Sequence, residues 1–239
     1  MKVKLLYFIL LLAIFSACKR AVIPASEVAL GKEYFPLSLG HFIEYQVDSI
    51  VYDDFHKTTD TIHFQYRDEI ADTFADNEGR RSFIVNRYQR QDSMSAWAEN
   101  ITYYITQANA SVEVVENNLR IIKMVFPVKA NTNWDGNIYI PSVSNPELNW
   151  LNGWDYHYAE INGDFENGIQ NFPNSLRVAE ANIYAGDSLG TIYSERIFAQ
   201  EVYAKNIGLI YKELVNWEYQ ENTHYRKGFV LVYRAIHYN

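Results

Sequence analysis

Apolar and polar residues alternate with a period of two along most of the chain beyond residue 33. In residues 43–48, and again in residues 61–66, every second side chain is apolar and those between are polar. This period is that of a β-strand with one face on a core and the other in solvent. Similar runs predict further strands at residues 82–88, 97–106, 111–115, 119–126, 154–161, 175–184, 192–203, 207–219 and 226–238.

Short polar turns join these runs in sequence order, which favours an antiparallel meander. Glu116-Asn117-Asn118 predicts one hairpin, because asparagine tolerates the positive φ of tight turns. A meander of this many strands forms a strongly curved sheet, a partly open barrel or a sandwich. We therefore expect a mainly all-β domain. Residues 192–204 contain Glu, Arg, Gln and Ala, so a helix is the alternative to a strand there.

The alternation stops between residues 127 and 153. Pro141, Pro146 and several asparagines interrupt this stretch and predict a long structured loop. A loop of this length in a compact domain is usually functional or mobile. It carries Trp134 and Trp150, with Trp154 just beyond its end.

The first residues of the chain have the pattern of an export signal. Lys2 and Lys4 precede an apolar run at residues 5–15, which is shorter than the ~20 residues that span a bilayer. Cys18, the only cysteine, follows two small residues. An exported chain with one cysteine has no internal disulfide partner for it, so the thiol is a candidate for modification.

Phe15-Ser16-Ala17-Cys18 resembles the bacterial lipobox, although Phe15 stands where that motif usually has leucine. The resemblance implies cleavage before Cys18, a thioether from its sulfur to diacylglycerol, and acylation of the new amine. Several acyl chains anchor a protein stably, whereas one binds a membrane only marginally. An ordinary secretory signal that leaves a free thiol is the alternative. The predicted layout is a lipoprotein signal peptide at 1–17, lipidated Cys18 and a short tether at 18–32, and a single β domain at 33–239.

Two further stretches resemble uncharacterised Bacteroidota cell-envelope lipoproteins. Tyr34-Phe35-Pro36-Leu37, followed by Gly40 and Tyr45, is similar to the opening of those proteins, and residues 208–213 are similar to one of their later strands. The resemblance implies a curved β scaffold like those of lipoprotein carriers and other binders of apolar ligands. Lys19-Arg20 stand after the cysteine, in place of the aspartate linked to inner-membrane retention. We therefore expect an outer-membrane anchor with the domain facing the periplasm.

The amino-acid composition of the chain limits the kinds of partner that it can bind. The chain has 21 basic and 29 acidic residues and a net charge of −8, which becomes −10 once Lys2 and Lys4 leave with the signal. This balance argues against nucleic acid, whose binding needs a basic face. The 19 tyrosines and 13 phenylalanines favour strands.

One segment matches a catalytic motif. Gly186-Asp187-Ser188-Leu189-Gly190 fits Gly-x-Ser-x-Gly and begins like the motif of GDSL esterases, with Ser188 as the nucleophile. That nucleophile requires a strand-to-helix turn, whereas this segment lies between two predicted strands and has the composition of a hairpin turn. We interpret it as a turn.

The sequence predicts no metal and no cofactor. Asn131, Asn133 and Asp135 are spaced like the start of a calcium loop, but Ser142 stands at the twelfth position, where such a loop needs glutamate. None of the six histidines is spaced as a zinc pair on one helix or strand.

An aromatic group is the best candidate for binding: Trp150, Trp154, Tyr156 and Tyr158. The last three share one strand face if the period of two holds, and such a face stacks on sugars or lines an apolar pocket. A core face is the alternative, because aromatic side chains supply much of a core's buried area.

These features together predict a non-enzymatic protein held at the membrane by its amino-terminal lipid. We expect it to be a binding or scaffold module for an apolar ligand, a glycan or an envelope protein. The alternative is an envelope hydrolase of esterase or glycosidase type, using Ser188 or a carboxylate pair such as Asp155 and Glu160.

Overall fold

The alternating sequence forms twelve strands in the computed structural model, which describes residues 30–187 and 191–239. The strands are β1 (Phe42–Asp53), β2 (Thr58–Ala75), β3 (Arg81–Arg90), β4 (Ala98–Gln107), β5 (Ser111–Glu116), β6 (Leu119–Val125), β7 (Asn133–Trp134), β8 (Tyr156–Glu166), β9 (Asn171–Gly186), β10 (Tyr193–Ala204), β11 (Gly208–Gln220) and β12 (Tyr225–Tyr238). Two short 3₁₀ helices accompany them, η2 (Lys32–Tyr34) and η3 (Pro146–Leu151). Over the same residues, no helix has the length and apolar character that crossing a bilayer requires. The all-β prediction is confirmed.

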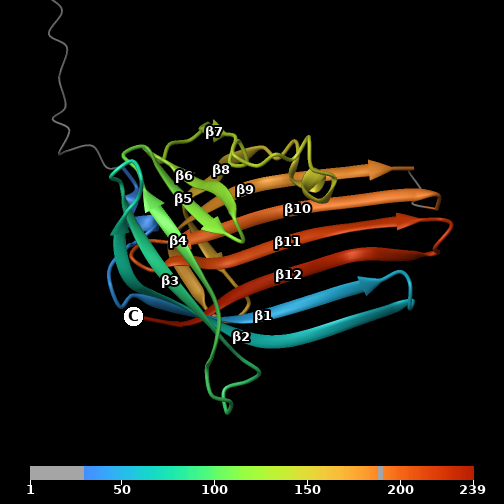
Figure 1. Cartoon of the computed structure of the whole chain (residues 1–239), viewed down its shortest axis with the longest axis horizontal. Helices are drawn as coiled ribbons and strands as arrows, with labels where there is room; N and C mark the ends of the chain where they lie inside the picture. The colour runs from blue at the N-terminus through green and yellow to red at the C-terminus, as the bar shows by residue number, and fades with distance from the viewer. Residues whose placement is uncertain (1–29, 188–190) are drawn as a thin grey trace, which may run out of the picture. The chain divides into compact units, whose positions relative to one another are not determined.

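The twelve strands form one antiparallel sheet in the order β6-β5-β4-β3-β2-β1-β12-β11-β10-β9-β8-β7. Strands that follow one another in sequence are paired except β6 and β7, which lie at the two ends of the sheet, and at the centre the first strand also pairs with the last. β1 and β12 lie side by side from Ile43↔Tyr238 to Tyr52↔Gly228. Figure 1 shows β1, β2 and β9 to β12 running together as long strands, with β3 to β6 curling across them. The sheet is a nearly closed barrel with one seam, between β6 and β7.

Side chains and loop backbone cross this seam where strand pairing stops. The Ile122 N–H donates to the Gly136 carbonyl over 2.8 Å, and the Trp134 indole N–H donates to the Ile122 carbonyl over 2.8 Å. On β8, the Tyr158 hydroxyl accepts from the Val125 N–H at 2.9 Å and donates to the Val125 carbonyl. The edge of β6 therefore has partners at both residues, which makes it a poor template for pairing with another chain.

The main core lies inside the curl, where β3 to β6 face β8 to β10. Phe83, Val112 and Met124 from the first group are almost fully buried, as are Leu176 and Val178 from the second. Burial of each such side chain stabilises the fold by about 1.5–3 kcal/mol. A second cluster forms where β1 meets β12, and its buried members include Ile43, Tyr45, Val47, Phe64, Phe172, Val202, Ile210 and Tyr233.

Two local predictions are confirmed. Asn117 and Asn118 adopt φ of 52° and 62° in the β5–β6 hairpin. Residues 193–204 form β10, so the strand interpretation of this segment holds and the helical alternative is wrong. The reason is its alternating burial against β9 and β11, which outweighs a weak helical propensity.

The loop and the strand after it differ in detail from the prediction. The stretch 127–153 contains β7 and η3, and η3 begins where the Asn145 side chain accepts the Glu147 N–H at 3.0 Å. β8 starts at Tyr156 rather than Trp154 and continues through Asn162-Gly163, which the sequence indicates as a turn. Register shifts between β8 and β9 at this point absorb the φ of 59° at Asn162.

Replacing Tyr158 with phenylalanine tests the seam. The Tyr158→Phe variant leaves the Val125 N–H without its partner, so we expect the free energy of unfolding to fall by about 1–3 kcal/mol. Urea denaturation measures the loss, and amide hydrogen exchange at Val125 should accelerate. Tyr184→Phe is the matched control, because the Tyr184 side chain is exposed. Equal stability of the two variants would show that the hydroxyl does not hold the seam.

Candidate functional site

A cavity of about 110 Å³ lies inside the curl of the sheet. Part of its wall is made of charged side chains from β2, β3, β5, β6, β10 and β11. The rest is largely apolar and comes from the segment before β1 and from several strands. The apolar wall includes Phe35, Leu37, Ile43, Ile70, Val85, Ile105, Val114 and Leu209.

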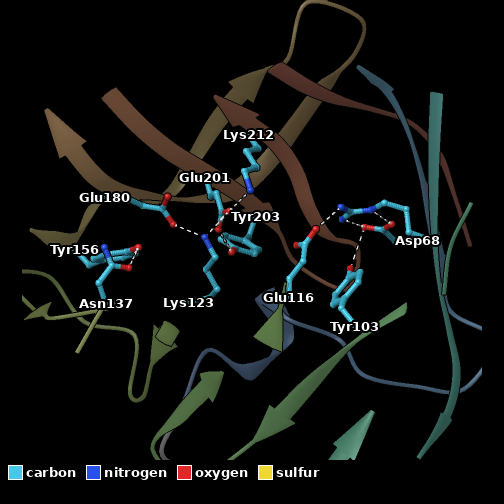
Figure 2. A network of polar contacts seen from close by, with 11 residues as sticks. Asp68, Tyr103, Glu116, Lys123, Asn137, Tyr156, Glu180, Glu201, Tyr203 and Lys212 are labelled. Carbon is cyan, nitrogen blue, oxygen red and sulfur yellow. Dashed lines mark hydrogen bonds and ion pairs between the residues drawn. The ribbon is translucent and has the colours of Figure 1, made fainter. Parts of the chain in front are cut away.

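Lys123 places its ammonium between two carboxylates in this interior (Figure 2). The Nζ atom lies 2.8 Å from Glu180 Oε1 and 2.8 Å from Glu201 Oε1. Lys212 Nζ lies 3.6 Å from the same Glu201 oxygen, and the Tyr203 hydroxyl donates to Glu201 Oε2 at 2.5 Å. Lys123 stands on β6, at one end of the sheet order, and its two carboxylates stand on β9 and β10. The ions therefore join the two halves of the sheet across the interior.

Glu180 and Glu201 share one ammonium but differ in pKa. Burial raises the pKa of Glu180 to about 7, and the charge of Glu201 adds to the rise, against the attraction of Lys123. Burial also acts on Glu201, but the charges of Lys123 and Lys212 outweigh it and lower the pKa of Glu201 to about 2. Glu201 is therefore the fixed anion, and Glu180 takes up or releases a proton near neutral pH.

Arg87, on β3, organises a second group of charges, in which Arg87 and Asp68 are largely buried and Glu116 is half-buried. Its Nε and Nη2 atoms donate to the two oxygens of Asp68 at 2.7 and 2.8 Å, and Nη1 donates to Glu116 at 2.8 Å. The Tyr103 hydroxyl donates to Asp68 at 3.0 Å. Two parallel bonds between a guanidinium and a carboxylate are strong and directional. Burial alone would lower the pKa of Arg87, but the charge of Asp68 raises it well above its ordinary value.

We call these seven residues the interior charge cluster: Asp68, Arg87, Glu116, Lys123, Glu180, Glu201 and Lys212. With Glu180 protonated, the positive and negative charges of the cluster balance. Each member contacts an opposite charge within the cluster, which offsets the cost of burying it. The arrangement can hold an apolar group against the apolar wall, and it can exchange one proton at Glu180.

The sequence pattern did not predict the interior charge cluster. Lys123 interrupts the apolar run of residues 121–125, and Glu201 stands with Gln200 between the apolar residues 197–199 and 202–204. A charge within an apolar strand is the signal that points to a buried ion pair, since an unpaired buried charge is very costly. The pattern alone does not reveal the partners, because Lys123 and Glu201 are 78 positions apart.

The four aromatic residues predicted as a binding face meet in and beside the core. Trp154, Tyr156 and Tyr158 are 9%, 0% and 6% exposed, and Trp150 is half-buried with its ring 5.6 Å from that of Trp154. The Tyr156 hydroxyl donates to Asn137 at 3.0 Å, as Figure 2 shows. Three of the four therefore lie in the core, as the alternative interpretation expected. A role in ligand binding stays a prediction.

The other candidate residues are spread over separate places. Asp135 accepts the Asn137 N–H at 2.9 Å, and Gly136 lies directly against the Tyr156 ring, so this segment forms a packed turn. Glu160 pairs with Arg177 at 2.7 Å. Cys18 and Ser188 lie outside the described residues. In residues 30–187 and 191–239, no group of three His, Asp or Glu side chains is arranged to hold a metal.

Comparisons with protein-family models and with curated proteins gave no match. Among solved structures, the chain is similar to a protein from Bacteroides fragilis, inferred to be exported and with a YmcC-like fold. The identity is 9%, the TM-score 0.38, and the match covers 85% of this chain and 98% of that one. It is also similar to a protein from Parabacteroides distasonis, inferred to be a lipoprotein, with 11% identity, a TM-score of 0.43, and coverage of 84% and 96%. Likeness at this level carries nothing about activity.

Glu180→Gln is expected to remove a pH dependence of stability. The pKa of Glu180 rises from 4.5 to about 7 on folding, so between these values the folded chain holds a proton that the unfolded chain releases. The stability of the native chain should therefore fall as pH rises through this window and stay low above it, by on the order of a few kcal/mol. Glutamine cannot ionise, so the variant should not show this fall. Urea midpoints at about pH 5, 6, 7 and 8 measure it.

Glu201→Gln is the contrasting variant for the same series. Because the pKa of Glu201 is lowered to about 2, its contribution is complete above about pH 4.5 and is lost only as pH falls towards 2. Removing its charge leaves Lys123 and Lys212 without their shared anion, and we expect the free energy of unfolding to fall by about 3–5 kcal/mol at neutral pH.

Parallel pH profiles of stability for the native chain and Glu180→Gln would contradict the assignment of the mobile proton to Glu180.

Proposed function

We propose that the chain is a lipid-anchored protein of the bacterial outer membrane, facing the periplasm, whose β domain binds the apolar end of a small ligand without catalysing a reaction. The interior cavity is the observation that carries this proposal. The lipobox-like residues Phe15 to Cys18 support the anchor, and Lys19-Arg20 support the periplasmic face.

The cavity has the size and lining for one apolar group. Its volume of about 110 Å³ is below that of a site for a drug-sized molecule, for which ~300 Å³ is a lower bound. It is close to that of an engineered apolar cavity of about 150 Å³ that binds benzene. We therefore infer that the end of an acyl chain, rather than a whole ligand, enters between residues such as Ile43 and Ile105.

The state of the cavity's polar groups supports binding over catalysis. Asp68, Glu116 and Glu201 each accept from a neighbouring cation, and a ring nitrogen of His41 lies 2.9 Å from the Ile207 carbonyl oxygen. A hydrolase needs a nucleophile held by a base that is available to it. The charged groups in this wall are instead engaged in hydrogen bonds and ion pairs with one another.

Binding of dodecanoate tests the cavity. We expect the mature chain, residues 18–239 with Cys18→Ser, to bind it saturably, with nuclear Overhauser effects between its terminal methyl and the methyls of Ile43 and Ile105. Val114→Phe places a ring in the cavity and should weaken binding by about tenfold, a change of about 1.4 kcal/mol.

Val51→Phe is the matched control, because Val51 is 40% exposed and is not part of the cavity wall. Dodecanoate that binds Val114→Phe as tightly as the native chain would contradict the cavity as the site. So would binding without methyl contacts to Ile43 and Ile105.

Radiolabelled palmitate tests the anchor. Cells expressing the full chain should incorporate the label into it and hold it in the membrane fraction. Cys18→Ser should lose both properties, whereas Ser16→Ala, which keeps the lipobox pattern, should retain them. A Cys18→Ser chain that still carries the label would show that the lipid is attached elsewhere.

A further inference from the structure

An open groove of about 470 Å³ lies near the hairpin ends of the long strands. Its walls come from five strands that are neighbours in the sheet order, β2, β1, β12, β11 and β10, and from the turn before β12. The residues that line it are Tyr52, Thr59, Ser194, Tyr219, His224, Tyr225 and Arg226. This volume falls in the range of about 300–1,000 Å³ that is typical of small-molecule sites. We call it the Arg226 groove.

The Arg226 groove is separate from the interior cavity. Lys212 points into the cavity from β11, and side chains alternate between the two faces of a strand. No register shift interrupts β11 between Tyr211 and Gln220 where it pairs with β12. Trp217 and Tyr219 therefore lie on the face of the sheet opposite to Lys212.

A glycine forms the floor between two aromatic side chains. Tyr52 and Trp217 are both paired directly with Gly228, so the three lie in one row across β1, β12 and β11. Gly228 adopts a φ of +134°, and a Cβ there would lie 2.1 Å from the Asn216 carbonyl oxygen. The row is thus held open by a position that only glycine fills without strain.

Arg226 is positioned by these aromatic rings. Its guanidinium carbon lies 4.3 Å from the Trp217 ring centroid and 5.7 Å from that of Tyr52. The side chain is exposed, and within residues 30–187 and 191–239 it forms no ion pair and donates no hydrogen bond. A guanidinium stacked by its face on aromatic rings keeps the N–H donors at its edge available to a planar anion.

The charge of the groove differs from that of the chain. The whole chain carries a net charge of −8, whereas none of the described residues that line the groove has a carboxylate. Arg226 is accompanied there by groups that donate and accept hydrogen bonds. The Tyr225 hydroxyl lies 2.6 Å from Thr59 Oγ1, and Tyr52, Tyr219 and Ser194 supply further hydroxyls.

We propose that the Arg226 groove binds an acidic saccharide, with the carboxylate or sulfate of one sugar on the Arg226 guanidinium. A guanidinium pairs with such an anion through two parallel hydrogen bonds. The half-buried tyrosines offer ring faces to the apolar faces of sugar rings, and the surrounding hydroxyls match sugar hydroxyls. This inference does not depend on the interior cavity, since the two sites lie on opposite faces of the sheet.

Titration with trigalacturonate, a heparin tetrasaccharide and maltotriose tests the proposal. We expect the mature chain with Cys18→Ser to bind at least one of the acidic probes saturably by calorimetry, with a shift of the Trp217 indole resonance assigned from Trp217→Phe. Arg226→Gln should weaken this binding about tenfold, which corresponds to 1.4 kcal/mol. Maltotriose, which is neutral, should bind far more weakly, and inorganic sulfate alone should not shift the indole resonance.

Lys227→Gln provides the matched control. It removes the same charge from the next residue, which lines a different pocket together with Asp54 and Glu218. Binding that Lys227→Gln weakens as much as Arg226→Gln would reduce the effect to general electrostatics and overturn the proposal. Failure of both acidic probes to bind, or equal affinity for maltotriose, would overturn it as well.

Discussion

The pairing of the first strand with the last is the constraint on which the rest of the structure depends. β1 and β12 run together over most of their length, although the residues they pair are 176 to 195 positions apart. Every other ladder joins strands that follow one another along the chain. The two local meanders, β1 to β6 and β7 to β12, therefore meet at this one ladder, and their outer edges come to face each other at the seam. A barrel that closes in this way places its interior between two halves that fold from separate parts of the sequence.

The interior charge cluster links the two halves of this barrel by polar contacts. Most of its charged side chains are buried, which is costly, and ion pairs offset this cost only when their geometry and hydrogen bonds are good. Here Lys123 reaches from one half of the sheet to Glu180 and Glu201 on the other, while Tyr203 and Lys212 complete the surroundings of Glu201. Because Glu180 is left with less compensation than Glu201, its proton is the one that responds to pH near neutrality.

The two proposed sites use opposite faces of the same strands. On β11, Lys212 belongs to the interior, whereas Trp217 and Tyr219 belong to the outer face. The interior offers an apolar wall with its charges paired, and the outer groove offers aromatic rings with an exposed guanidinium. An apolar chain and an acidic sugar are chemically different, and the sheet separates them by its thickness. Such a protein would hold both kinds of group at the membrane to which Cys18 is expected to anchor it.

The sequence by itself determined most of the strands and the Asn117-Asn118 hairpin, and it is the basis of the expected membrane anchor. The period of two is a local property, so it identified β1, β2 and β10, and Asn117-Asn118 identified a hairpin from backbone sterics alone. The lipobox-like residues around Cys18 are likewise a local motif.

Only the tertiary structure decided what the faces of those strands meet. The alternation of residues along a strand indicates that Glu201 and Tyr203 share a face, but it does not indicate that Lys123 lies opposite them. It placed Trp154, Tyr156 and Tyr158 together, and only the packing of β8 against the core showed that they are buried. Arg226, Trp217 and Tyr52 became neighbours through the β1–β12 ladder and a glycine between the rings. Contacts of this kind depend on strand order and register, which arise from the packing of the whole sheet and leave no local trace in the chain.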